Sequence, residues 1–133
     1  MDSENNKERL RKAKEYYYKI GAVPCRAFGG ELVYFNSHGW NHVLRKGRKR
    51  RDFAEQNNRI QLLQFVEYIL KVTEKISDYR ESTNPGSLVC FWTIERYVNR
   101  KKIRVVIRRT NDGRKHFFSI MGYNEKIPEG TFP

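Results

Sequence analysis

The stretch SLVCFWTIERYVNRKKIRVVIRRTNDGRKHFFSIMG, residues 87–122, decides the fold of this chain. Apolar and polar residues alternate within it, and a period of two is typical of β-strands with one buried face. The segments with this alternation are 87–98, 103–110 and 115–122. Asn-Asp-Gly at 111–113 predicts a hairpin between the last two, and residues 99–102 predict the other turn. The stretch therefore predicts a three-stranded antiparallel meander.

The lengths of the two turns predict which side chains share a face, because side chains alternate along a strand. We assume a two-residue loop at 112–113 and a four-residue loop at 99–102. One face is then the apolar core face: Trp92, Ile94, Ile103, Val105, Ile107, Phe118 and Ile120. The other carries Thr93, Glu95, Tyr97, Arg104, Val106, Arg108, Phe117, Ser119 and Met121. In this register Arg108 faces Phe117, and His116 lies at the end of the core face.

Helical patterns precede the meander. The elements predicted upstream are a charged helix over 3–20, a strand over 31–35, a short helix over 38–44 capped by Asn36 or Ser37, and a long helix over 52–76. Helices followed by strands predict an α+β fold, with N-terminal helices packed on a small antiparallel sheet of about four strands in a single domain. We expect residues 1–30 to form a docked helix and loop, 31–123 the core, and 124–133 a peripheral tail.

Composition limits the class of partner. The chain has 133 residues, of which 38% are hydrophobic, and this excludes a disordered protein. Its formal net charge of +12 indicates a polyanionic partner. Nucleic acid is the first expectation, an acidic protein the second and an anionic membrane the third. Charge selects the partner but says nothing about activity.

The cysteines and the first residues indicate a cytoplasmic setting. Cys25 and Cys90 are far apart, so neither a disulfide framework nor a four-ligand zinc spacing is predicted. MDSENNKERL lacks an apolar signal region, and no run reaches transmembrane length. We expect no metal, no small-molecule cofactor and no membrane partner.

The segment HGWNHVLRKGRKRR, residues 38–51, carries the strongest indication of function. Its two histidines, His38 and His42, are spaced to share a helix face. A cationic run follows, and such a run binds polyphosphate. The predicted nucleic-acid-binding residues are Arg45, Lys46, Arg48, Lys49, Arg50 and Arg51, joined by Arg104 and Tyr97 on the sheet.

RNA can be cut without a metal by its own 2′-hydroxyl, given a base, an acid and a cation for the phosphate. The predicted catalytic residues are His38 and His42 as acid and base, Arg108 and Arg104 as phosphate clamp, Ser119 and Thr93 as orienting groups, and Glu95 as a further possible base. The rival use of the two histidines is zinc binding. That use is disfavoured because the glutamate of an H-E-x-x-H motif is absent and no third ligand is nearby.

Two segments resemble a known superfamily: YFNSHGWNHVLRKG after the first strand, and RRTNDGRKHFFSIMG as a terminal hairpin. The layout is similar to that of the barnase–EndoU–colicin–RelE (BECR) nucleases, in particular their phage-associated branch. The resemblance covers roughly residues 31–123. It implies a metal-independent ribonuclease or toxin domain with His38 or His42 as acid/base, and Arg108 with Ser119 at the phosphate. It leaves the role of His116 open.

Our hypothesis is therefore an endoribonuclease or RNase-like toxin, for which His42→Ala should abolish cleavage and spare RNA binding. The alternative is a non-catalytic RNA- or DNA-binding protein. There, substitution of either histidine would be nearly silent, and removal of the basic run would weaken binding. A third possibility is a module that binds an acidic partner, such as an inhibitor or immunity protein. The class of RNA cannot be read from these residues.

Overall fold

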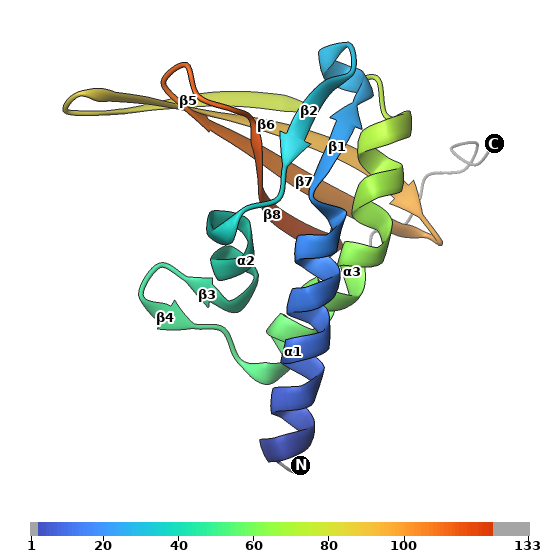
Figure 1. The fold of residues 1–133 in the computed structure, drawn as a ribbon. Helices are drawn as coiled ribbons and strands as arrows, with labels where there is room; N and C mark the ends of the chain where they lie inside the picture. Colours follow the sequence, from blue (N-terminus) through green and yellow to red (C-terminus); the bar gives the residue numbers. More distant parts are fainter. Residues whose placement is uncertain (1–2, 124–133) are drawn as a thin grey trace.

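A mixed six-stranded sheet forms one layer of the protein, and helices cover one of its faces (Figure 1). The computed structural model describes residues 3–123. The helices are α1 (Ser3–Ile20), the 3-10 turn η1 (Arg26–Phe28), α2 (Ser37–Leu44) and α3 (Phe53–Val72). The sheet strands are β1 (Ala22–Cys25), β2 (Glu31–Tyr34), β5 (Asp78–Asn84), β6 (Ser87–Val98), β7 (Lys101–Thr110) and β8 (His116–Tyr123). This confirms the predicted α+β single domain; the predicted tail lies outside the described residues.

The strand order is β1-β2-β8-β7-β6-β5. The predicted meander is present as β6, β7 and β8, each antiparallel to the next. The expectation of about four strands, all antiparallel, was too simple, because β2 runs parallel to β8. The two strands pair at Tyr34 and His116, and the Tyr34 amide donates to the carbonyl of Lys115 at 3.0 Å. This pairing places the segment before α2 beside the start of β8.

Two strands of the sheet were not predicted. All seven residues of β5 are exposed, so DYRESTN has no apolar alternation to reveal a strand. β1 contains Pro24, which suits an edge strand because proline has no amide hydrogen to donate. The long helix also ends at Val72 rather than 76, and the Ser77 amide already donates to Thr93 of β6. The residues before β5 therefore lead into the sheet.

The turn between β6 and β7 is tighter than predicted. Asn99 and Arg100 both have positive φ, 50° and 65°, as in a two-residue turn of the primed type. Cross-strand pairs consequently shift by two residues, so that Glu95 lies opposite Arg104. A shift of two keeps each side chain on its face, and the predicted faces of β6 and β7 therefore hold.

A β-bulge overturns part of the predicted register between β7 and β8. Val106 pairs with Ser119 as predicted, but Ile107 pairs with Phe117, which leaves Phe118 as the extra residue. Phe117 is fully buried in the core, and Phe118 lies on the opposite face. The assignment of these two phenylalanines was therefore wrong. The same bulge places His116 opposite Arg108 instead of Arg109.

The core lies between the covered face of the sheet and the helices. Its buried side chains come from α3, the three meander strands, β1, β2, α1 and α2. Tyr17 of α1 is fully buried and packs against Phe35, Trp40 and Phe117. Phe35 stacks on Phe117 with ring centroids 5.1 Å apart. Burying each such side chain contributes about 1.5–3 kcal/mol, so this aromatic cluster holds α2 firmly against β8.

Glycine at position 39 allows α2 to approach β8 closely. A Cβ at this position would come within 2.6 Å of both Cδ2 and the carbonyl oxygen of Phe117, and would also clash with the Tyr17 hydroxyl. Glycine normally lowers helix stability by about 1 kcal/mol. Here that cost is offset by contact between α2 and the sheet, and this contact brings the histidines of α2 to the open face.

Candidate nucleic-acid and catalytic site

The open face of the sheet contains two neighbouring hollows. The first, which we call the histidine hollow, has a volume of about 500 Å³. The residues that define it here are Tyr34, Asn36, His38, Arg108, Arg114 and His116. They come from β2, the start of α2, β7, the β7–β8 loop and β8. The parallel pairing of β2 with β8 therefore builds this hollow.

His38 and His116 face each other in the histidine hollow. Their ring centroids are 5.6 Å apart and the planes are inclined by 36°. His38 is exposed in the first turn of α2, where the side chain of Asn36 accepts hydrogen bonds from the amides of His38 and Gly39. This cap confirms Asn36 rather than Ser37 as the N-cap residue and fixes the position of His38.

The environment of His116 defines its protonation. Its Nδ1 lies 3.2 Å from the carbonyl oxygen of Phe117. A carbonyl only accepts, so Nδ1 carries the hydrogen and Nε2 holds the lone pair of the neutral ring. Burial lowers the pKa of His116 despite this hydrogen bond, and the charges of Arg108 and His38 lower it further. Nε2 is therefore the nitrogen of the neutral His116 ring that can accept a proton.

The histidine hollow is cationic. The guanidinium of Arg114 lies over the ring of Tyr34 at 4.4 Å, and that of Arg108 lies about 6 Å from the rings of Phe91 and Phe118. Within the described part of the chain, none of the residues lining this hollow is Asp or Glu. Two arginines beside two imidazoles suit a phosphate group.

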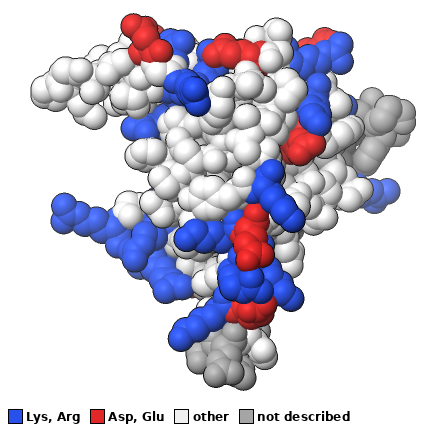
Figure 2. All heavy atoms as spheres, in the orientation of Figure 1, with Lys and Arg blue, Asp and Glu red and all other residues white. Residues whose placement is uncertain are grey.

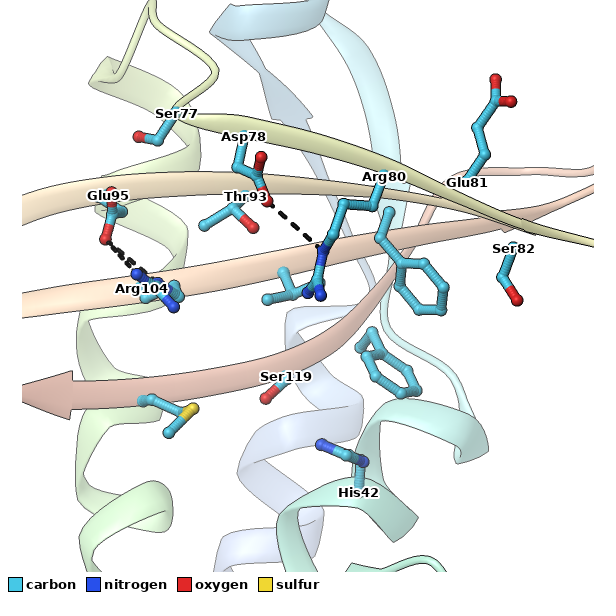
Figure 3. A pocket seen from close by; sticks show the side chains of 14 residues that line it. His42, Ser77, Asp78, Arg80, Glu81, Ser82, Thr93, Glu95, Arg104 and Ser119 are labelled. Carbon is cyan, nitrogen blue, oxygen red and sulfur yellow. Dashed lines mark hydrogen bonds and ion pairs between the residues drawn. The ribbon is translucent and has the colours of Figure 1, made fainter.

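The second hollow, which we call the sheet pocket, has a volume of about 820 Å³ and is drawn in Figure 3. Side chains from β5, β6, β7, β8 and α2 line it, including Asp78, Arg80, Thr93, Glu95, Arg104 and Ser119. Arg104 donates to Oε2 of Glu95 at 3.1 Å, and Asp78 pairs with Arg80 at 3.5 Å. Several of the residues predicted from the sequence to form the site line this pocket and not the histidine hollow. They are His42, Thr93, Glu95, Arg104 and Ser119.

His42 has a different environment from that of His38. Its ring stacks on Phe118 at 4.3 Å, and its Nε2 lies 3.3 Å from Nη2 of Arg51. Burial lowers the pKa of His42 to about 4, and the charges of Arg51, Arg59 and Lys46 contribute to this shift. His42 is therefore uncharged at neutral pH, and its acceptor nitrogen is already bonded. This geometry favours His38 and His116, rather than His42, as the acid and base.

Two buried arginines hold the junction of α2, α3 and β8. Arg51 donates to the backbone carbonyl of His42 and to Glu55, and its side chain is only 3% exposed. Arg59 donates to the hydroxyl of Ser119 at 3.2 Å and to the carbonyl of Ile120 at 3.0 Å. The predicted binding residue Arg51 thus lies inside the protein, and Ser119 already has an arginine partner.

The remaining basic run forms a two-stranded ribbon that we call the basic hairpin, residues 45–50. It consists of β3 (Arg45–Lys46) and β4 (Lys49–Arg50). Arg45 lies opposite Arg50, and Lys46 lies opposite Lys49, with all four exposed. Figure 2 shows this cluster of Lys and Arg without Asp or Glu among them, whereas both signs alternate along α1. Like charges opposite each other destabilise a ribbon, so a polyanion would stabilise this one.

The structure divides the predicted site residues into groups. His38 and Arg108 are in the histidine hollow, and five others are in the sheet pocket. Tyr97 lies beside Lys102 at the far end of β6 and lines neither hollow in the described chain. His116 was not among the predicted catalytic residues. The only sequence signal for a role of His116 is its position next to a hairpin in a basic chain. The bulge that places it opposite Arg108 has no simple sequence pattern.

Comparison of the chain with protein-family models, with curated proteins and with solved structures returned no match. The described residues contain no group of three or more His, Cys, Asp or Glu side chains that could hold a metal ion. Among the helices described, none has the length and apolar character needed to cross a membrane.

Proposed function

We propose that this protein is a metal-independent endoribonuclease whose reaction centre is the histidine hollow. The observation that supports the proposal is that the rings of His38 and His116 face each other, with centroids 5.6 Å apart, in a hollow that Arg108 and Arg114 also line. RNA cleavage by the 2′-hydroxyl requires a base, an acid and a cation, and two imidazoles beside arginines can supply all three. The same activity is implied by the resemblance to the BECR nucleases.

In the proposed reaction, His116 accepts the proton of the 2′-hydroxyl at Nε2. The 2′-oxygen then attacks the adjacent phosphorus, and the bond to the 5′-oxygen of the next nucleotide breaks. His38 donates a proton to that leaving oxygen, so the products are a 2′,3′-cyclic phosphate and a free 5′-hydroxyl. Arg108 and Arg114 stabilise the negative charge that builds on the phosphate. His116 is assigned as the base because its lowered pKa favours the neutral ring.

The basic hairpin would hold the strand that is cut. Its exposed cations extend from the end of α2, the helix that carries His38. Contacts to phosphate give affinity without sequence information. The second candidate function, RNA or DNA binding without catalysis, relies on this same hairpin and would not need the histidine pair.

The proposal is tested by incubating RNA with the purified protein in EDTA. We expect cleavage to 2′,3′-cyclic products, and a loss of roughly 10²–10⁴-fold in rate for His38→Ala and for His116→Ala. His42→Ala separates this assignment from the one made on the sequence. It should lose much less activity than the other two variants, whereas the sequence assignment expects complete loss.

For each variant, we would also measure binding of a 2′-O-methyl oligonucleotide that cannot be cleaved. Circular dichroism would check that the variant is folded. Absence of cleavage together with intact binding would favour the non-catalytic alternative. Cleavage that needs added metal would contradict the mechanism.

A further inference from the structure

We propose that the sheet pocket is a nucleobase subsite that selects unpaired nucleotides next to the phosphate in the histidine hollow. The inference rests on the proposed function in one respect: it takes the phosphate in the histidine hollow to be the one at which RNA is cleaved. The subsite itself is argued from the charge, the aromatic walls and the hydrogen-bonding groups of the sheet pocket.

The charge of the sheet pocket differs from that of the rest of the protein. Three carboxylates line it, from Asp78, Glu81 and Glu95, against two guanidiniums, from Arg80 and Arg104. His42 adds no charge at neutral pH, because its pKa is about 4. In a chain of net charge +12, the lining of this pocket is therefore close to neutral. It therefore suits an uncharged polar group and disfavours a phosphate.

Aromatic rings form the wall between the two hollows. Phe91 and Phe118 meet edge to face at 5.5 Å, and His42 stacks on the other side of Phe118. The guanidinium of Arg108, which lines the histidine hollow, lies over both phenylalanines. A phosphate at Arg108 is consequently a neighbour of the aromatic wall. A flat base attached to that phosphate could stack there, and such stacking is worth about 1–3 kcal/mol per base.

The hydrogen-bonding side chains that line the sheet pocket include Thr93, Glu95 and Ser119 (Figure 3). The hydroxyl of Ser119 accepts from Arg59, so its own hydrogen remains for a ligand. Arg104 and Lys102 both contact Oε2 of Glu95, and among the described residues no hydrogen bond reaches Oε1. A carboxylate oxygen accepts from an amino group such as the cytosine N4 amine. The pocket therefore favours an amino-bearing base over uracil.

A base inside a duplex could not enter this pocket, because its faces are stacked and its pairing edge is covered. Sequence-selective proteins accordingly read RNA at single-stranded loops and ends. The inferred substrate class is RNA with at least one unpaired, amino-bearing base beside the scissile phosphate.

The experiment measures binding by fluorescence anisotropy, with 2′-O-methyl oligonucleotides that cannot be cleaved. One set compares a single strand with the same strand annealed to its complement, and a second set compares a poly-uridine strand with the same strand carrying one cytosine in place of a uracil. We expect at least about tenfold tighter binding to the single strand, and about tenfold preference for the cytosine-containing strand.

Two variants with matched controls locate the effect. Phe91→Ala should lose the preference for single strands, whereas Phe53→Ala, an exposed phenylalanine at the start of α3, should retain it. Glu95→Gln should lose the preference for cytosine, whereas Glu67→Gln, an exposed carboxylate paired with Lys71, should keep it. Each control removes the same chemical group away from the pocket.

Equal binding of single strand and duplex, or equal effects of the paired variants, would overturn the inference. These outcomes are distinguishable from failure of the proposed function. Cleavage in EDTA without any base or strand preference would leave the ribonuclease standing and reject the subsite. Base and strand preference without cleavage would support the subsite and reject the ribonuclease.

Discussion

Nη2 of Arg51 lies 3.3 Å from Nε2 of His42 and thereby determines the state of that histidine. An arginine side chain only donates hydrogen bonds, so Nε2 accepts and Nδ1 carries the hydrogen of the neutral ring. Protonation of His42 would place two cations against each other in a half-buried site. This environment favours an uncharged His42, whereas its sequence position predicted a catalytic acid or base.

The first prediction concerns the pH dependence of stability. Because the pKa of His42 falls from an ordinary 6.5 to about 4 on folding, the unfolded chain binds more protons between these values. The contribution of neutral His42 is complete above pH 6.5 and is lost as the pH falls toward 4. After allowance for partial exposure, we expect a loss on the order of 2 kcal/mol over this range.

Urea unfolding of the wild type and of His42→Gln at a series of pH values measures this contribution. The variant should show a shallower decline between pH 6.5 and 4, since glutamine does not titrate. Parallel curves for the two proteins would show that His42 is not the group responsible.

The second prediction concerns the approach of α2 to the sheet. Gly39→Ala would place a methyl group within 2.6 Å of Phe117 in a packed core. Overpacking of this kind costs about 1–3 kcal/mol, and the displaced helix would move His38 away from His116. The urea concentration at the midpoint of unfolding and the rate of RNA cleavage should both decline.

Gly122→Ala is the matched control for this prediction. There, the nearest atom to an added Cβ belongs to the flexible side chain of Lys101 at 2.8 Å, and the next belongs to Leu62 at 3.1 Å, so a smaller adjustment is needed than at position 39. A smaller loss of stability at position 39 than at position 122 would mean that α2 does not pack as tightly as described.

The third prediction concerns the salt dependence of RNA binding. Replacing four cations of the basic hairpin by serine should flatten the dependence of log K on log salt by several units, because each phosphate contact contributes about 0.7–0.9. The variant combines Lys46→Ser, Arg48→Ser, Lys49→Ser and Arg50→Ser. The control removes the same charge from the exposed side of α1 through Lys7→Ser, Lys12→Ser, Lys14→Ser and Lys19→Ser. Equal slopes for the two variants would show that binding follows net charge rather than the hairpin.

The fourth prediction concerns the pH profile of cleavage. With His116 as base, kcat/KM should decline on the acid side at a pH below the ordinary histidine value of about 6.5, because burial lowers the pKa of this ring. His116→Ala should remove the acid limb of the profile, and a limb that persists unchanged in this variant would assign the base elsewhere.

Much of the fold could be predicted where one face of an element is buried. The alternation in β6 and β7 and the apolar spacing of α3 reflect such burial, and their faces agree with the structure. The edge strand β5 has no buried face, so its residues carry no corresponding pattern. In this chain, therefore, an element could be predicted from the sequence where one of its faces is buried.

The candidate site was harder to predict, because it depends on contacts between distant segments. The sequence led to His38 and Arg108, which line the histidine hollow, but His116 joins them only through the bulge at Phe118 and the pairing of β8 with β2. Similarly, the cationic run gave no sign that Arg51 turns inward while residues 45–50 stay exposed. Neither a bulge nor the direction of a long side chain has a simple sequence signature.

The position of β8 has a consequence for the synthesis of this protein. β8 is the last strand in sequence among the described residues, yet it lies in the middle of the sheet, between β2 and β7. Until β8 has been synthesised and has paired, His38 has no imidazole opposite it, and the chain lacks the proposed reaction centre. Because long-range pairing of strands is a slow step in folding, the proposed reaction centre would form late, only once β8 has paired with both β2 and β7.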